Sequence, residues 1–314
     1  MATSVTVVGA FHEEVEMSER TPHHGIIVGT DGSPSAWAAL KWAAGEAAMH
    51  HVPLTVVHVA PSLPPMTSTM IWPSGRVADE ILATEEAEAR RIIDEAVEFV
   101  RSKGGGDRPE VNSEALFGGV VPALVDLSTE AKMVVVGCRG RSGSDRRLLG
   151  SVSSGVVHHA RCPVVVVHGE TPPEQSDKRP VLVGIDGSPA SELATEIAFD
   201  EASRRGVPLM ALHVWADADM SIVPSMEPAA LQQAAETTLA EGLAGWQERY
   251  PEVEVQRLVE FENPATHLLR HSENASLVVV GSRGRGGFAG MLLGSVSSAV
   301  AHGSRAPVIV ARQQ

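Results

Sequence analysis

Three glycines and a serine recur in both halves of the chain at the same spacing. The stretch 133–167 returns as 277–311, and in each copy an apolar run ends at a glycine that two further glycines and a serine follow in register. These residues are Gly137, Gly140, Gly150 and Ser151 in the first copy and Gly281, Gly284, Gly294 and Ser295 in the second. Glycine lets a chain approach a ligand closely and adopt positive φ, so backbone N–H groups can bind a phosphate without a lysine. The repeat therefore predicts two phosphate-binding loops.

The serine that ends each loop is expected to begin a helix, whose first N–H groups lack partners and whose positive dipole end favours an anion. The hydroxyls of Ser151 and Ser153, and of Ser295 and Ser297 in the second copy, would add donors. An ordinary connection, with glycines in turns and a capping serine, is the alternative. The thirteen-residue connection exceeds the usual two to six residues, which favours a binding loop.

A second shared motif, Asp-Gly-Ser-Pro, follows the first apolar run of each half at 31–34 and 186–189. Ser33 and Ser188 are placed as helix N-caps before a proline at the first helical position. Asp31 and Asp186 have two open interpretations. Each would accept hydrogen bonds from a ribose or a base, or each would form an Asx turn that prepares the cap.

Apolar runs and helical patterns alternate in each half. Expected strands in the first half are 25–30, 54–60, 110–116, 133–137 and 164–167, with a long helix at 77–103; the second half repeats them at 181–185, 209–215, 254–260, 277–281 and 308–310, with a helix at 228–250. Such strands call for a parallel sheet with helices on both faces. His58 and His213, inside the second strands, are expected to be packed rather than catalytic.

The fold class that this pattern predicts is α/β, with two tandem doubly wound domains that each have a five-stranded parallel sheet in the order 3-2-1-4-5. The expected boundaries are a flexible leader at 1–24, a first domain at 25–168, a linker at 169–179 and a second domain at 180–314. Ligands of such sheets bind where the winding reverses, between strands one and four. The glycine loop and the Asp-Gly-Ser-Pro motif would therefore share one crevice.

Composition narrows the function. The formal charge of −14 argues against a nonspecific nucleic-acid or membrane-surface binder. No apolar run is long enough to span a membrane, and the two cysteines, absent from the matching positions of the other copy, indicate free thiols in a reducing cytoplasm. A Gly-x-x-x-x-Gly-Lys-Ser/Thr loop is missing, which disfavours a conventional P-loop NTPase. No metal site is expected.

These residues resemble the universal stress protein family in its tandem form, from Gly25 to Arg312. The family's Gly-2x-Gly-9x-Gly-Ser/Thr pattern is met in both halves. The resemblance implies one ATP per domain, with Mg²⁺ left open, and places Asp31 and Asp186 near the adenosine. It also implies that Val59 and Val214 contact adenine through the backbone.

Members of this family generally dimerise through the fifth strand. An unpaired apolar edge would invite aggregation, so the fifth strands 163–168 and 307–312 are expected to pair within the chain. Further self-association stays open, as does the identity of a regulatory protein partner.

Three functions fit these features. The leading hypothesis is a cytoplasmic ATP-binding protein that regulates a stress response. The second is a slow ATPase or an adenylyl-transferring enzyme, for which no catalytic residue is assigned. The third is a nucleotide-free dimerisation scaffold, against which the intact glycine loops argue.

Overall fold

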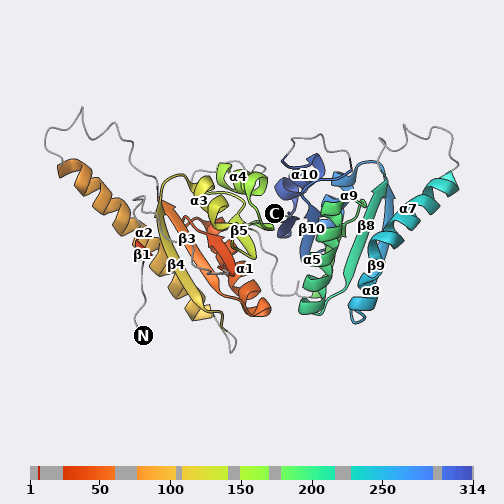
Figure 1. Cartoon of the computed structure of the whole chain (residues 1–314), viewed down its shortest axis with the longest axis horizontal. Coiled ribbons are helices and arrows are strands. Elements are labelled where there is room, and N and C mark those ends of the chain that lie inside the picture. The colour runs from red at the N-terminus through yellow and green to blue at the C-terminus, as the bar shows by residue number, and fades with distance from the viewer. Residues whose placement is uncertain are drawn as a thin grey trace, which may run out of the picture.

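The two halves of the chain form a single eleven-stranded sheet flanked by helices in the computed structural model (Figure 1). The structure describes residues 6–7, 24–60, 76–103, 108–140, 149–169, 178–215, 228–285 and 292–312. The variable segment 61–75, most of the leader 1–24 and most of the linker 169–179 lie outside these ranges.

The elements of the first half follow the expected alternation. They are β2 (Ile26–Gly29), α1 (Pro34–His50), β3 (Leu54–Ala60), α2 (Arg76–Lys103), β4 (Val111–Phe117), α3 (Val120–Leu127), β5 (Met133–Gly137), α4 (Ser151–His159) and β6 (Val164–Val167). A two-residue strand, β1 (Thr6–Val7), pairs in parallel with β4. The first domain therefore has a short sixth strand at its outer edge, drawn from the segment that the sequence suggested as a leader.

The second half repeats this order. It contains β7 (Val181–Gly184), α5 (Pro189–Arg205), β8 (Leu209–Trp215), α7 (Pro228–Leu243), α8 (Trp246–Arg249), β9 (Val255–Phe261), α9 (Pro264–Ser272), β10 (Leu277–Gly281), α10 (Ser295–Gly303) and β11 (Val308–Ala311). The single helix expected at 228–250 is divided in two. The break falls at Gly245, whose φ of 78° lies in the left-handed region that glycine tolerates and that no α-helix continues through.

Within each half the strands are parallel, and their order is 3-2-1-4-5 as expected: β4-β3-β2-β5-β6 in the first half and β9-β8-β7-β10-β11 in the second. The fifth strands, β6 and β11, pair with each other in the antiparallel direction, with Val165 opposite Ile309. Neither fifth strand is an exposed edge, because each closes the sheet of the other half.

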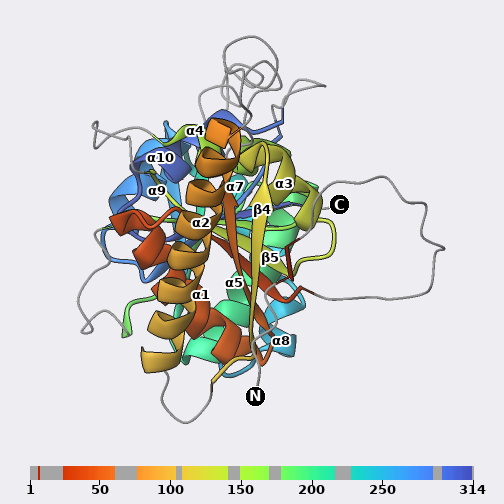
Figure 2. The ribbon, with the colours of Figure 1, turned by 90° about the vertical axis from the view of Figure 1, so that its left-hand side faces the viewer.

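Side chains of the strands alternate between two apolar cores, one on each face of the sheet. Ile26 and Val28 belong to the core that also contains residues of α1, α2, α5 and α7, whereas Ile27 belongs to the core that contains residues of α3, α4, α9 and α10. Figure 2 shows this arrangement from the first half, with α1 and α2 on one side of the sheet and α3 on the other. Both cores contain residues of both halves, so pairing of β6 with β11 merges the two domains into continuous apolar layers.

Two expectations about chemistry outside the crevice are confirmed. Cys138 and Cys162 are free and buried, and burial raises the pKa of the Cys162 thiol to about 12. His58 and His213 are buried, and the Nδ1 atom of each lies 2.7 Å from a backbone carbonyl, of Thr30 and Ile185 respectively.

Among the described residues, no helix is long and apolar enough to cross a membrane.

Candidate functional site

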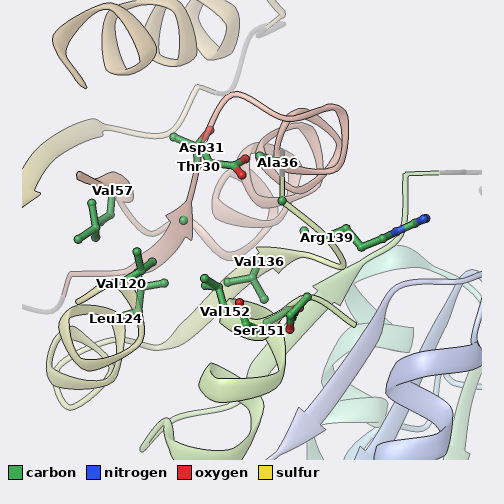
Figure 3. Close-up of a pocket in the computed structure, with 16 residues that line it drawn as sticks. Thr30, Asp31, Ala36, Val57, Val120, Leu124, Val136, Arg139, Ser151 and Val152 are labelled. Carbon is green, nitrogen blue, oxygen red and sulfur yellow. Dashed lines mark hydrogen bonds between the residues drawn. The ribbon is translucent and has the colours of Figure 1, made fainter. Parts of the chain in front are cut away.

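The winding of the first sheet reverses between β2 and β5, which pair directly. At their carboxyl ends lies a cavity of about 330 Å³ that the glycine loop and the Asp-Gly-Ser-Pro motif both line (Figure 3). Its lining includes Asp31, Val59, Gly137, Gly140, Gly150, Ser151 and Ser153. The structure therefore brings together every site residue that the sequence suggested for the first half.

Asp31 serves the turn and faces the crevice at the same time. Its Oδ1 atom accepts a hydrogen bond from the amide of Ser33 (2.9 Å), and the Ser33 hydroxyl accepts from the amide of Ala36 (3.2 Å) to cap α1. The carboxylate nevertheless borders the cavity. The turn contact uses Oδ1 alone among the two carboxylate oxygens, so a role in the turn does not exclude a role as a ligand acceptor.

The second half reproduces this turn. Ser188 donates from its amide (2.9 Å) and its hydroxyl (2.6 Å) to Oδ1 of Asp186, and the Ser188 hydroxyl accepts from the amide of Ser191 (3.3 Å). The amide of Arg285 donates to Oδ2 of Asp186 (3.3 Å). The second glycine loop is thus tied to the aspartate by its own backbone.

The first glycine of each loop is required by packing rather than by a ligand. A Cβ atom at Gly137 would lie 2.6 Å from the backbone carbon of Ser35, and one at Gly281 would lie 2.7 Å from that of Ala190. Real Cβ atoms do not approach backbone atoms so closely. Glycine here lets the end of β5 or β10 lie against the first turn of α1 or α5.

The second glycine of each loop faces the aspartate. A Cβ atom at Gly140 would lie 2.8 Å from Oδ2 of Asp31, and one at Gly284 would press against Oδ2 of Asp186. None of the six loop glycines has a positive φ, so the loops do not use that freedom of glycine. The first two glycines of each loop share a close approach that leaves no room for a Cβ atom, whereas a Cβ atom at Gly150 or Gly294 would make only ordinary contacts.

The third glycine, Gly150, is the N-cap of α4 and brings no side chain to the helix end. Its amide donates to the carbonyl of Cys138 (2.8 Å), and its carbonyl accepts from the amide of Ser154 (2.9 Å). The amides of Ser151, Val152 and Ser153 precede this first helical bond and lie outside the α4 ladder. Figure 3 shows Ser151 and Val152 at the cavity.

The second loop ends in the same way, because the amide of Gly294 donates to the carbonyl of Ser282 (2.8 Å) and the amide of Ser298 donates to the carbonyl of Gly294 (2.9 Å). Each half therefore presents the positive end of a helix to its crevice.

The serine hydroxyls divide into two kinds. Ser151 and Ser295 are exposed at the first position of their helices. Ser153 is buried, and its hydroxyl lies 3.0 Å from the carbonyls of Cys138 and Gly150, whereas the hydroxyl of Ser297 donates to the carbonyl of Gly281 (2.5 Å). In this structure the hydroxyls of Ser153 and Ser297 hold the loop against the helix, and their role as phosphate donors stays a prediction.

The arginines of the loops contribute backbone contacts. The carbonyl of Arg139 accepts from the hydroxyls of Ser33 (3.4 Å) and Ser35, and the carbonyl of Arg283 lies 3.2 Å from the hydroxyl oxygen of Ser188. The Arg139 side chain extends away from the other residues that line the cavity (Figure 3). The remaining arginines of the first loop, Arg141, Arg146 and Arg147, lie outside the described residues.

Sequence reasoning missed the apolar wall of the cavity. Val57 of β3 and Val120 and Leu124 of α3 line it together with Val59 at the end of β3. The sequence pattern of α3 does not distinguish a valine that lines a cavity from one that packs in the core, so these residues could not be predicted as part of the site. Val214 lies at the corresponding place near the end of β8, half-buried.

Both halves combine a doubly wound sheet with a glycine motif that leads into a helix N-terminus, which defines a tandem α/β protein. A model of the universal stress protein family matches residues 23–168 and 178–312. The chain belongs to this family and carries two of its domains in tandem.

Relatives of similar length support this assignment. Universal stress protein Rv2005c of Mycobacterium tuberculosis is 50% identical over 299 residues, which cover 95% of this chain and all of that protein. Universal stress protein Rv2623 of the same organism is 50% identical over 302 residues, which cover 95% and 99%. A crystal structure of a universal stress protein from Archaeoglobus fulgidus matches with a TM-score of 0.65 and 26% identity, covering 93% of this chain and all of that one.

Proposed function

We propose that each half of the chain binds one ATP in its crevice, and that the protein acts in the cytoplasm as a regulator of a stress response whose state depends on bound nucleotide. The observation that carries this proposal is the close approach of Gly140 to the Asp31 carboxylate beside the N-terminus of α4, whose N-cap Gly150 has no side chain. A family member with intact glycines in both loops is expected to bind ATP in both halves.

The triphosphate would lie against the first turn of α4, where the amides of Ser151, Val152 and Ser153 are outside the helical ladder. A helix N-terminus supplies about half a positive charge, which compensates for the lack of a lysine in the shared loop pattern. The exposed Ser151 hydroxyl would add a side-chain donor beside these amides. Ser295 and the first turn of α10 would have the same role in the second half.

The adenosine would occupy the apolar side of the cavity. Val57, Val120 and Leu124 offer it an apolar wall, and Oδ2 of Asp31 is the atom that would accept from a ribose hydroxyl. The volume of about 330 Å³ falls at the lower end of the range of small-molecule sites, about 300–1,000 Å³. Val59 and Val214 are proposed to contact adenine through their backbone.

The pairing of β6 with β11 also bears on how the protein would associate with other copies of itself. Because β6 and β11 occupy each other's edges, the edge that family members use for dimerisation is closed within this chain. We propose that the tandem protein is a self-contained equivalent of the family dimer. We propose that the two domains of this equivalent are residues 25–168 and residues 180–314.

Saturating ATP should therefore raise the melting temperature of the full chain. A ligand at 100 times its Kd stabilises its domain by about 2.7 kcal/mol, which is a shift of about 5–10 °C for a domain of roughly 150 residues. Differential scanning fluorimetry with and without Mg²⁺ measures this shift, and adenosine, which lacks phosphates, is the control ligand. An unchanged melting temperature at millimolar ATP would contradict the proposal and favour a nucleotide-free scaffold.

A further inference from the structure

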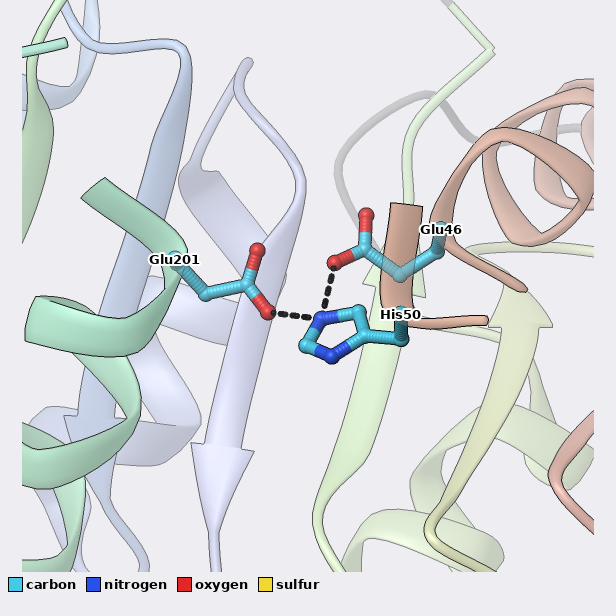
Figure 4. A group of neighbouring side chains, drawn as sticks. All are labelled: Glu46, His50 and Glu201. Atoms are coloured by element: carbon cyan, nitrogen blue, oxygen red, sulfur yellow. Dashed lines mark hydrogen bonds and ion pairs between the residues drawn. The ribbon is translucent and has the colours of Figure 1, made fainter. Parts of the chain in front are cut away.

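A buried polar cluster lies where the C-terminal part of α1 in the first half meets that of α5 in the second (Figure 4). Its members are Glu46 and His50 on α1 and Glu201 and Arg205 on α5. Glu46 and Glu201 occupy the same position relative to the first proline of their helices, as do His50 and Arg205. The cluster is thus a repeated pair in which the second copy has arginine where the first has histidine.

The contacts cross between the halves. Nε2 of His50 lies 3.0 Å from Oε1 of Glu201 and 3.2 Å from Oε1 of Glu46. Nη2 of Arg205 donates to Oε2 of Glu201 (2.9 Å) and to Oε2 of Glu46 (2.5 Å). Each carboxylate therefore meets both bases, one on its own helix and one on the helix of the other half.

Charge balance within this cluster requires a proton. The side chains of Glu46, His50 and Glu201 are at most 2% exposed, and that of Arg205 is 22% exposed. Two carboxylates facing one guanidinium leave a net negative charge, which is costly to bury unpaired. A proton on the imidazole that bridges the two carboxylates neutralises the cluster.

The neighbouring elements supply few further charges. Asp200 of α5 lies 3.8 Å from Nδ1 of His50 and is itself paired with Arg204 (2.9 Å). The strands against which the two helices pack, β6 and β11, contribute buried aliphatic side chains such as Val165 and Ile309. The described groups that determine the protonation of His50 are therefore those of α1 and α5.

The titration behaviour agrees with this geometry. Burial lowers the pKa of His50, but its hydrogen bonds with Glu201 and Glu46 outweigh burial, and the pKa lies above its ordinary value. Burial and the charge of Glu201 raise the pKa of Glu46 to about 7. Burial also opposes ionisation of Glu201, yet the His50 hydrogen bond and the Arg205 charge lower its pKa to about 2.

A metal ion is the other possible occupant, because one ligand atom from each of Glu46, His50 and Glu201 lies within 4.8 Å of the other two. Arg205 argues against this interpretation, since its guanidinium already bonds to both carboxylates. A divalent ion beside it would give the buried site a net positive charge. The proton balances the charge and the metal does not.

We propose that Glu46, His50, Glu201 and Arg205 form a proton-dependent latch between the two halves, which a single bound proton on the Glu46–His50 pair closes. Deprotonation leaves a buried negative charge at the interface and weakens the pairing. The chain would thereby hold its two domains together more firmly as the pH falls toward mildly acidic values.

The sign of the pH dependence follows from the two raised pKa values. A group with a pKa raised by folding stabilises the folded state fully below its unfolded pKa, and this contribution is lost as the pH rises through the folded pKa. For Glu46 the window runs from about 4.5 to about 7, and for His50 it begins at about 6.5. Glu201, whose pKa is lowered, loses its contribution only as the pH falls from about 4.5 toward 2.

Glu46→Gln tests the latch in the full chain, because a carboxamide keeps the shape of a protonated carboxyl group and cannot ionise. For the unmodified protein, the unfolding equilibrium constant is expected to rise about tenfold or more between pH 5.5 and 8, since one linked proton changes it up to tenfold per pH unit. Glu46→Gln should remove most of that rise. Glu248→Gln, which makes the same charge change on an exposed residue of α8, should retain it.

A second measurement follows the imidazole directly by NMR, with His50→Gln to assign its signal. The His50 ring should titrate above its ordinary pKa of about 6.5 in the unmodified protein and at a lower pH in Glu46→Gln. The same pH dependence in the unmodified protein and Glu46→Gln, or a neutral His50 at pH 6, would overturn the latch. A melting temperature that Zn²⁺ raises and EDTA lowers, in the unmodified chain but not in Glu46→Gln, would overturn it in favour of a metal site.

Discussion

Replacing Gly140 and Gly284 together by valine should abolish the ATP-dependent rise in melting temperature and leave the fold intact. A Cβ atom at either position meets the Oδ2 atom of Asp31 or Asp186, which we propose binds the ribose. The branched side chain would fill the crevice between the loop and the aspartate. If affinity falls about 100-fold, ligand at 100 times the original Kd stabilises the protein by only about 0.4 kcal/mol instead of about 2.7.

The single variants separate the two halves. Gly140→Val alone should halve the number of nucleotides bound per chain, measured by equilibrium dialysis with labelled ATP, and Gly284→Val should do the same. Gly169→Val is a matched control, because a Cβ atom there meets nothing within 4 Å. Full binding by the double variant would show that nucleotide binds elsewhere or that the loops are structural connections.

The repeated sequence predicted the helices and strands around the site well, because helix caps, apolar runs and turn residues all indicated the same fold. Ser33 and Ser188 cap their helices, the apolar runs are the parallel strands, and the fifth strands pair as an exposed apolar edge demands. Duplication made each inference stronger, since both halves had to satisfy the same pattern. The shared crevice followed from strand order alone.

The roles of individual residues within the site were less predictable. The glycines of one loop are equivalent in a sequence pattern. A Cβ atom at Gly137 would clash with the backbone of Ser35, whereas one at Gly140 would clash with the carboxylate of Asp31. The Ser153 hydroxyl was predicted to bind phosphate, and in this structure it lies within hydrogen-bond distance of two backbone carbonyls, which the spacing did not indicate. Such distinctions depend on which atoms of other helices and strands lie near each loop residue. The spacing of residues along the chain does not reveal those neighbours.

The interface cluster was beyond sequence reasoning for the same reason. Glu46 and His50 are four residues apart, a spacing that is common on solvated helix faces. Their burial arises because Glu201 and Arg205, more than 150 residues later, pack against them when β6 pairs with β11. A contact between two domains leaves no periodic signal within either of them.

Arg205→Met should be the most destabilising of the substitutions considered for this chain. It removes the guanidinium that bonds to Glu46 and Glu201 and leaves two buried carboxylates facing a single imidazole. Removal of one partner from a buried ion pair costs about 3–5 kcal/mol. Urea unfolding at pH 8 measures the loss, and Arg204→Met, which breaks the more exposed pair with Asp200, should cost less than about 1 kcal/mol.

The pH dependence of the stability lost in Arg205→Met shows whether Arg205 stabilises the interface by its charge or by its packing. At pH 5.5 Glu46, whose pKa is raised to about 7, binds a proton and one of the stranded charges disappears, so the cost of Arg205→Met should shrink. Adding Glu46→Gln should rescue part of the stability at pH 8, because the remaining pair of His50 and Glu201 is then balanced by one proton. An equal cost at both pH values without rescue would mean that Arg205 stabilises the interface through its stacking on Trp42, where its guanidinium lies 5.8 Å from the ring centre.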